Sequence, residues 1–368
     1  MAPEKYKNIQ VLTDVPADQL DLTMRYIVAA TGIQCAGCHV ADAATAEFQP
    51  EKDDRPGKKT ARLMMNMVKT INAGDFGARV SCGTCHAGRN QPAGLQTATM
   101  LTTEQIAALA QAAAARQGAP GQGGAPGGQA GQVAPGAAAG RGVQPAPVPA
   151  DDVLAKYIEA IGGRAALEKL QSLTMSGTVT NRAAQTVAFT IEEKGNKYRE
   201  SIQSQPAAVT RGFDGSAGWQ QVGARIAGLD LFLLQQTLRS ADLTLALTLK
   251  DKYPNLTAGR AARIPATTAS GTPVAVNVIQ GSPAQYVTEQ LMFDATSGLL
   301  VRRVARTATG LRGQLVEQFD YSDYRVVAGV KVPFQVVRSN WDTFDTFKMT
   351  DIKANTAIDD ARFAKPKN

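Results

Sequence analysis

The spacing of apolar residues changes along the chain and divides it into segments of different character. In the first hundred residues the apolar positions recur every three or four residues, which is typical of amphipathic helices. The first expected helix opens near Pro16 and continues through Leu20, Met24, Ile27 and Val28. A second helix is expected from about residue 60 to residue 72. Each helix is followed by a loop and a similar cysteine-containing stretch, which indicates an internal duplication.

From residue 151 onward the apolar period changes from helical spacing to alternation. Two short helices separated by Gly162 and Gly163 come first, and a helical insertion is expected near residues 228–250. Turn signals at Asp214-Gly215, Ser297-Gly298 and Ala328-Gly329 separate the alternating segments. We expect Trp219 and Phe334 to pack inward and Pro333 to mark a strand end. Strands are expected at 173–180, 186–202, 272–281, 286–294, 299–307, 315–327, 330–339 and 345–356. Many short antiparallel strands with few helices predict a strongly curved sheet packed on helices.

The two patterned segments are separated by a stretch with no periodicity. Residues 117–150 are almost all Gly, Ala, Pro and Gln, and Arg141 is their single charged residue. Such a composition buries too little apolar surface to offset the entropy of ordering. The predicted organisation is therefore a mainly α domain over 1–105, a flexible linker over 106–150, and an α+β domain with a curved antiparallel sheet over 151–368.

Composition narrows the classes of function. The formal net charge is +7 over 368 residues, and the Lys and Arg residues form no dense block. This pattern argues against a nucleic-acid partner. No apolar run is long enough for a transmembrane helix. The residues after Met1 do not form a cationic head followed by an apolar run, so any export signal is expected to lie outside this numbering.

The candidate chemistry is concentrated in two short stretches, QCAGCHV at 34–40 and SCGTCHA at 81–87. Together they use all four cysteines and both histidines of the chain. Disulfides would explain an even number of cysteines but not the histidine after each pair. An all-thiolate zinc site would use both pairs and leave the histidines without a role. Covalent c-type haem uses every residue, because two thiols form thioethers and the adjacent imidazole binds the iron. We therefore expect two c-type haems, attached at Cys35 and Cys38 and at Cys82 and Cys85, with His39 and His86 as iron ligands.

A sixth ligand is needed for each hexacoordinate iron, and the chain has no third histidine. Methionine is the natural candidate, since its thioether raises the reduction potential relative to a second histidine. Met24 lies on the helix before the first motif. Met64, Met65 and Met67 lie on the helix before the second, where Met64 and Met67 share a helix face and Met65 points away by about 100°.

These motifs have a recognisable context. The stretches KNIQVL, CAGCHV, KKTARLMMNMVKTIN and VSCGTCHAGRNQP, within residues 5–93, resemble the cytochrome c subunit of photosynthetic reaction centres and related dihaem proteins. The resemblance implies that a helix carrying the axial methionine precedes each haem motif. It implies Met24 as the ligand of the first haem and Met64 as that of the second, with Met67 as the alternative. The purple-bacterial subunit carries four haems, whereas this chain has two haem motifs. The resemblance therefore does not imply a role at a reaction centre.

The C-terminal domain has a weaker resemblance. The stretches VLAKYIEAIGGRAALEKLQSLTMSGTV, GFDGSAGWQQ, FDYSDYRVVAGVKVPFQV and IKANTAIDDARFAKP, within 150–368, are similar to the LolA/LolB-like lipoprotein-sorting fold. That fold is a half-open antiparallel barrel closed by helices, and its cavity takes acyl chains. The resemblance implies no catalytic residues, and residues 151–368 contain neither His nor Cys.

The leading hypothesis is an electron-transfer protein rather than an enzyme, with the C-terminal domain as a docking or scaffold module. Expected partners are a redox donor and acceptor, one of which can be a membrane-bound complex. Because bacteria attach c-type haem outside the cytoplasm, the expected location is the periplasm or the cell surface. Two alternatives stay open: a haem enzyme with one open iron site, peroxidase-like or gas-binding, and a lipid or lipoprotein carrier with a redox appendage.

Overall fold

The computed structural model describes residues 1–42, 48–74, 80–90, 147–241, 243–265, 272–310, 313–341 and 343–367. Met1–Gln91 and Ala146–Asn368 belong to one compact unit. The predicted linker over 106–150 lies outside the described residues except for its last four positions.

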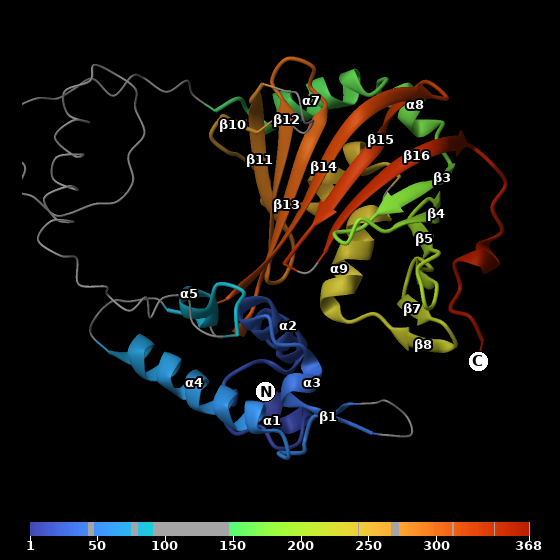
Figure 1. Cartoon of the computed structure of the whole chain (residues 1–368). Helices are drawn as coiled ribbons and strands as arrows, with labels where there is room; N and C mark the ends of the chain where they lie inside the picture. The colour runs from blue at the N-terminus through green and yellow to red at the C-terminus, as the bar shows by residue number, and fades with distance from the viewer. Residues whose placement is uncertain are drawn as a thin grey trace, which may run out of the picture. The chain divides into compact units, whose positions relative to one another are not determined.

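Short helices and one two-stranded ribbon make up the described part of the N-terminal segment (Figure 1). The elements are α1 (Ala2–Lys5), η1 (Ala17–Gln19), α2 (Leu20–Thr31), α3 (Cys35–Cys38), β1 (Val40–Ala41), β2 (Phe48–Gln49), α4 (Pro56–Ala73) and α5 (Cys82–His86). Helix α2 ends at Gly32, whose φ of 68° is the left-handed conformation that glycine adopts without strain. Helix α4 begins four residues earlier than expected because Pro56 is well suited to the first helical position. Both predicted helices are confirmed.

The N-terminal segment has its own small core. Val11, Leu12, Val15 and Leu20 pack with Met65 of α4, and all five side chains are buried. These apolar contacts hold α4 against the start of α2. Residues on one face of α4 therefore set its position, and its other faces are left for a different contact.

Residues 172–354 form one large sheet in which every pairing is antiparallel. Its strands in chain order are β3 (Ser172–Thr180), β4 (Thr186–Lys194), β5 (Lys197–Ile202), β6 (Val209–Phe213), β7 (Gly218–Val222), β8 (Arg225–Gly228), β9 (Thr257–Ala258), β10 (Ala262–Ile264), β11 (Val274–Ala284), β12 (Val287–Asp294), β13 (Leu300–Ala308), β14 (Gln314–Val327), β15 (Val330–Ser339) and β16 (Phe344–Ala354). The spatial order runs from β10 through β16, continues at β3 and ends at β8, and β9 pairs with β11. Consecutive strands from β3 to β8 and from β10 to β16 are neighbours in space, and β16 lies beside β3.

Helices pack on the inner side of the curved sheet, as Figure 1 shows for α9. They are α7 (Ala150–Ala160), α8 (Arg164–Glu168), α9 (Leu231–Ser240) and α10 (Leu245–Lys252), and η3 (Asp360–Arg362) follows the last strand. The core beneath them contains Phe189 and Phe347, whose rings meet edge to face at 5.1 Å between centroids. The strongly curved antiparallel sheet predicted from the alternating pattern is thus present, with helices on its concave face.

The predicted turns explain how the strands reverse. Ala328 and Gly329 have φ of 50° and 83°, as a two-residue hairpin between β14 and β15 requires. At the β6–β7 turn, Asp214 Oδ1 accepts hydrogen bonds from the backbone N–H groups of Ser216 and Ala217, both at 2.8 Å. The turn signals read from the sequence are confirmed at these positions.

Two side chains pack inward as predicted, whereas one predicted strand end is wrong. Trp219 and Phe334 are 2% and 8% exposed, which confirms that they pack inward. Pro333 does not end a strand, because it lies within β15 and pairs with Tyr324 of β14. It is tolerated there because the pairing of β15 with β16 begins only at Gln335, so no neighbour on that side needs its missing N–H.

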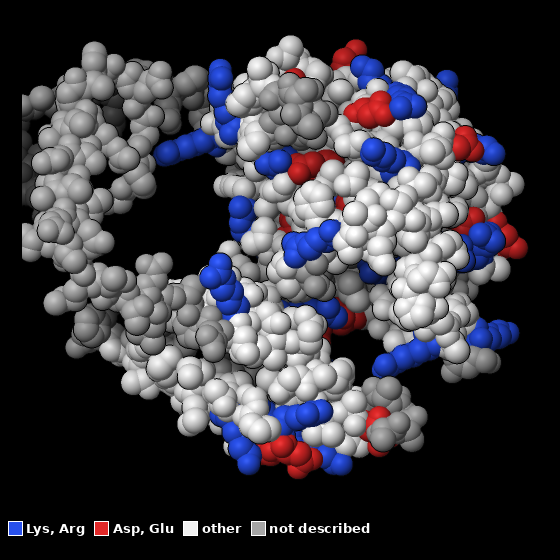
Figure 2. Space-filling view, viewed as in Figure 1, with Lys and Arg blue, Asp and Glu red and all other residues white. Residues whose placement is uncertain are grey.

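Charged side chains of both signs are spread over the surface. Figure 2 shows Lys and Arg scattered over one face, many of them beside Asp or Glu. The helices that the structure describes include none with the length and hydropathy of a membrane crossing.

Candidate functional site

The first motif forms a single helical turn. Cys35 and Cys38 are the first and last residues of α3, and both thiols are free. Burial, with a smaller contribution from Cys35, raises the pKa of the Cys38 thiol. The chain then leaves the helix at His39, where φ is −115° and ψ is 142°. The motif thus presents two thiols one turn apart and an imidazole immediately beyond them.

His39 has a ring nitrogen without a partner. Among the described residues, its Nδ1 is one of two buried side-chain N or O atoms that lack a hydrogen-bond partner. Burial first, and the charge of Lys58 second, lower the pKa of this imidazole. A neutral imidazole is the form that binds a metal ion. The orphaned nitrogen and the neutral ring both fit a residue whose partner is a prosthetic group.

The second motif forms α5 and is one residue longer. Cys82 is half-buried, Cys85 is exposed, and burial raises the pKa of the Cys82 thiol. His86 Nδ1 lies 3.0 Å from the carbonyl oxygen of Arg89. A proton on Nδ1 completes this hydrogen bond and leaves Nε2 as the lone-pair nitrogen, the arrangement usual for metal-binding histidines. The Nε2 atom of His86 is therefore available to bind a metal ion.

Helix α4 packs closely on the first motif. A Cβ atom at Gly57 would lie 2.4 Å from the carbonyl oxygen of Gly37, so only glycine permits this approach. The thiol sulfur of Cys38 would lie 3.6 Å from the same Cβ atom. Residues Gly57 and Gly37 thus set the distance between α3 and the helix that carries Met64.

Helix α2 packs in the same way on the second motif. The Tyr26 hydroxyl donates to Ser81 Oγ at 2.6 Å and accepts from the backbone N–H of Gly83 at 3.0 Å. The backbone N–H of Gly88 donates to the carbonyl of Ala30 at 2.8 Å. The two halves of the duplication therefore interlock, because each motif contacts the helix that precedes the other motif.

The four methionines differ in environment. Met65 is 8% exposed and belongs to the small core, and Met24 is partly buried against the same core. Met64 and Met67, in contrast, are 40% and 46% exposed. The exposed side chains belong to a stripe along α4 that we call the α4 stripe, formed by Leu63, Met64, Met67 and Ile71.

An exposed apolar stripe on a helix whose opposite face is already packed needs a further contact. A porphyrin is a flat apolar group of suitable chemistry, and the stripe includes two thioethers. The free thiols, the imidazoles and this stripe together fit c-type haem. Residues Arg62 and Asn72 fix the helix that carries the stripe.

Arg62 donates to Asp53 Oδ2 at 2.8 Å and to the carbonyl of Asn8 at 3.2 Å. The Asn72 amide donates to the carbonyl of Val80 at 2.8 Å and accepts from its N–H at 2.9 Å. The part of α4 around Met64 is thus anchored by Arg62 on one side and by Asn72 on the other.

Other contacts were not found by sequence reasoning. Tyr26 and Gly57 carry no motif signal, and the glycine-rich character of the two cysteine stretches was the one hint of close approach. The described residues include no cluster of three or more His, Cys, Asp or Glu side chains able to hold a metal ion. The two cysteine pairs are accordingly not brought together as a zinc site requires.

Comparison with known proteins supports the first resemblance. Residues 1–121 match the family model described as photosynthetic reaction centre cytochrome C subunit. This part of the chain is therefore similar to a cytochrome c that transfers electrons, and the match implies c-type haem and redox partners. A search of curated proteins gave no match.

Solved structures similar to the C-terminal part include members of the fold that the sequence predicted. A LolA superfamily protein from Nitrosomonas europaea is 14% identical, with a TM-score of 0.41, over 59% of this chain and 98% of that one. A DUF1329 family protein from Desulfovibrio piger is 9% identical, with a TM-score of 0.40, over 59% of this chain and 97% of that one. Both scores are low, and the strand order described above defines this part of the fold by itself.

Proposed function

We propose that this protein is an exported electron carrier with two covalently bound c-type haems. The observation that carries the proposal is the duplicated unit of helix, paired thiols and imidazole, in which His86 Nδ1 is held by a carbonyl and Nε2 is left for iron. The family match over residues 1–121 supports the same function. When bound, each haem iron supplies one-electron redox chemistry.

The residues of the chain hold and shield these groups. Cys35 and Cys38 form the thioethers of the first haem, and Cys82 and Cys85 those of the second. His39 and Met24 are the proposed axial ligands of the first iron. His86 and Met64 are those of the second, and Met67 packs beside the porphyrin or replaces Met64. The α4 stripe would shield a bound haem from water, which would favour the high potentials expected of methionine ligation.

The C-terminal sheet domain is proposed as the scaffold of the second haem motif. Tyr26, which holds Ser81 and Gly83, is buried with Leu22, Phe232 and Leu315 in a cluster that joins α2 to the sheet domain. The adjacent side chain, Arg25, forms an ion pair with Asp230 at the N-terminus of α9. A rigid support of this kind keeps the reorganisation energy of electron transfer small.

Localisation and partners follow from the cofactor. Because bacteria complete c-type attachment outside the cytoplasm, we place the protein in the periplasm or on the cell surface. Its partners are a redox donor and a redox acceptor, one of which can belong to a membrane-bound complex. The division into 1–105, 106–150 and 151–368 is kept as the proposed domain organisation.

The test is to express the chain with a complete c-type haem maturation system and to measure the mass of the denatured protein. We expect two covalent haems in the wild type. The double variants Cys35→Ser/Cys38→Ser and Cys82→Ser/Cys85→Ser should each retain one haem. A wild-type mass without added haem contradicts the proposal. Rapid binding of carbon monoxide to one ferrous haem would indicate an open iron site and a haem enzyme instead.

A further inference from the structure

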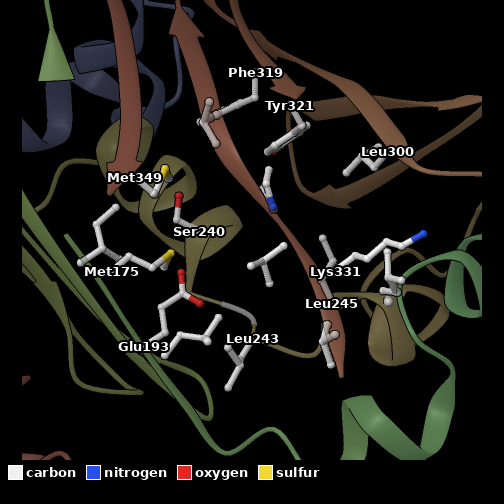
Figure 3. A pocket seen from close by; sticks show the side chains of 18 of the residues that line it. Met175, Glu193, Ser240, Leu243, Leu245, Leu300, Phe319, Tyr321, Lys331 and Met349 are labelled. Carbon is white, nitrogen blue, oxygen red and sulfur yellow. The ribbon is translucent and has the colours of Figure 1, made fainter. Parts of the chain in front are cut away.

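The sheet domain contains a cavity that the haem proposal does not use. It has a volume of about 240 Å³ and lies between the concave face of the sheet and the α9–α10 region (Figure 3). Met175 of β3 and Met349 of β16 line one side, and Ser240 and Leu243 line another. Drug-sized ligands fill pockets of roughly 300–1,000 Å³. The cavity therefore has room for one substituted ring, but not for a whole lipid.

Aromatic side chains supply much of its wall. Six of them line the cavity: Tyr157, Tyr198, Phe319, Tyr321, Tyr324 and Phe347. Aromatic faces and thioethers pack well against a flat ring. Burial raises the pKa of Tyr321, so its hydroxyl stays protonated. The wall is thus suited to a planar group rather than to a flexible chain.

The charged groups in the wall balance one another. Arg303 Nε donates to Glu289 Oε2 at 2.7 Å, and Arg338 Nη1 donates to Glu200 Oε2 at 3.3 Å. Burial alone would raise the pKa of Glu200 and Glu289, but the neighbouring arginines outweigh burial and lower both values. Each pair therefore stays ionised with no net charge. These two pairs therefore offer a charged ligand no counter-ion, and Glu193 and Lys331 also line the cavity.

Arg239 differs from the other two arginines. Its side chain is 4% exposed, and its Nη1 and Nη2 groups are paired with Glu289 and Glu317. Its Nε is the second buried atom, besides His39 Nδ1, that lacks a partner in the described part of the chain. A buried donor without a partner is unfavourable, and a ligand with an acceptor oxygen would satisfy it. Other atoms of Arg239 line the cavity, so a turn of its side chain would bring Nε to an acceptor inside it.

We propose that the cavity binds the head group of a quinone, with the Arg239 Nε–H donating to one of its carbonyl oxygens. A quinone is planar and uncharged and carries an acceptor oxygen. Among planar, uncharged molecules with an acceptor oxygen, quinones are the redox-active ones. Lys331 lines the cavity but is exposed, and Figure 3 shows its side chain pointing away from the cavity. This side gives a quinone tail a way out. The site goes beyond the proposed haem function, because it assigns a ligand to the sheet domain.

Helix α9 connects the cavity with the N-terminal segment. Its first turn contains Phe232, which packs with Tyr26 of α2, and its last turn contains Arg239 and Ser240. Ten helical residues span about 15 Å. The quinone site therefore lies one short helix away from the contact that supports the second haem motif.

The experiment measures binding of decylubiquinone to the full haem-loaded chain by equilibrium dialysis, after removal of bound lipids. We expect one quinone per chain. Ala246→Leu fills the cavity, since Ala246 lines it, and should weaken binding at least about tenfold by steric exclusion. Arg239→Lys keeps the charge for Glu317 but removes the Nε donor, and should weaken binding by up to about tenfold. The matched control is Ala227→Leu on the exposed part of β8, which should bind as the wild type does.

Competition with a fatty acid distinguishes a quinone site from an acyl-chain site. Palmitate in excess should leave quinone binding unchanged. Displacement by palmitate, together with wild-type binding by Arg239→Lys, would show an acyl-chain site and overturn the proposal. Absence of quinone binding to folded wild type, or equal binding by Ala246→Leu, would also overturn it. Circular dichroism of each variant shows whether it is folded, and the haem content by mass reports separately on the proposed electron carrier.

Discussion

Single hydroxyl and amide groups determine how the haem motifs are held. Tyr26 satisfies two partners around Cys82 with one oxygen atom, and Asn72 satisfies both backbone groups of Val80. These residues are not expected to contact iron. They position the residues that we propose as iron ligands, so their loss should affect one haem more than the other.

Replacement of Tyr26 by Phe tests this selectivity. The change leaves the N–H of Gly83 and the hydroxyl of Ser81 without the phenol oxygen and should destabilise the protein by about 1–3 kcal/mol. It should also shift the reduction potential of the haem at Cys82 and Cys85 and leave the other haem unchanged. Thermal unfolding and redox titration measure the two effects. Equal shifts at both haems would contradict the local role of Tyr26.

Asp53 makes a pH-dependent contribution to the same segment. Arg62 first, then Lys58 and Asn8, hold the pKa of this carboxyl well below its usual range. The ionised carboxylate is present in both folded and unfolded chains above about pH 4, and it stabilises the fold there. As the pH falls below about 4, the unfolded chain takes up a proton first and the stabilisation is progressively lost.

Asp53→Asn should therefore lower the melting temperature at pH 7, with a smaller difference from wild type at pH 3. Asp54→Asn, at the exposed neighbouring position, is the control and should change little at either pH. A constant difference for Asp53→Asn across this range would show that the carboxylate does not act through its charge.

At the scale of elements, α4 is distinguished by having two apolar faces. Met65 faces the small core and Val68 is also buried, whereas the α4 stripe is exposed. The spacing of apolar residues predicted this helix. Helical geometry places Met65 about 100° around the helix axis from Met64. Sequence alone could not show which face would pack on protein, because both faces are apolar and the choice depends on residues far away in the chain.

The ligand assignment on α4 can be tested by three matched variants. Met64→Leu should abolish the methionine-to-iron near-infrared band of one ferric haem, because leucine has no sulfur. Met67→Leu and Met65→Leu should keep both bands, with stability changes below about 1.5 kcal/mol. Loss of the band in Met67→Leu instead would make Met67 the ligand.

The strands show where local patterns suffice and where they fail. The long strands from β11 to β16 alternate clearly, and their ranges were predicted to within a few residues. The strands β6, β7 and β8 were not predicted separately, because they have four or five residues each and are rich in Gly and Gln. The prediction of a strand end at Pro333 was wrong. Proline is tolerated within β15 because β16 does not pair there, and no local sequence pattern shows where that pairing begins.

At the scale of the whole molecule, contacts between the two ends of the chain join the helices to the sheet. The backbone N–H of Gly310 donates to Thr23 Oγ1 at 3.1 Å across 287 positions of sequence. The cysteine motifs could be identified from the sequence because their chemistry is local. The roles of Tyr26, Gly57 and Gly313 could not, since they arise only from close approach in the folded chain.

Gly313→Ala should disturb this junction. A Cβ atom there would lie 2.4 Å from the Tyr26 ring, which is buried and cannot move aside easily. We expect destabilisation by about 1–3 kcal/mol from overpacking. Gly228→Ala is the matched control, because the nearest atom to its Cβ would be 4.0 Å away. Differential scanning calorimetry measures both, and an unchanged melting temperature for Gly313→Ala would show that the ring and the loop are not in firm contact.

The absence of a side chain at position 313 also constrains how such chains can diverge. A methyl group there and a phenol at position 26 compete for the same space, so neither site can change freely while the other is kept. Where a related chain has a larger residue at the position of Gly313, we expect a smaller one at the position of Tyr26. Because the phenol oxygen also holds the segment around Cys82, such a chain would need another donor for Ser81, and a loop of the sheet would thereby limit the evolution of a redox centre.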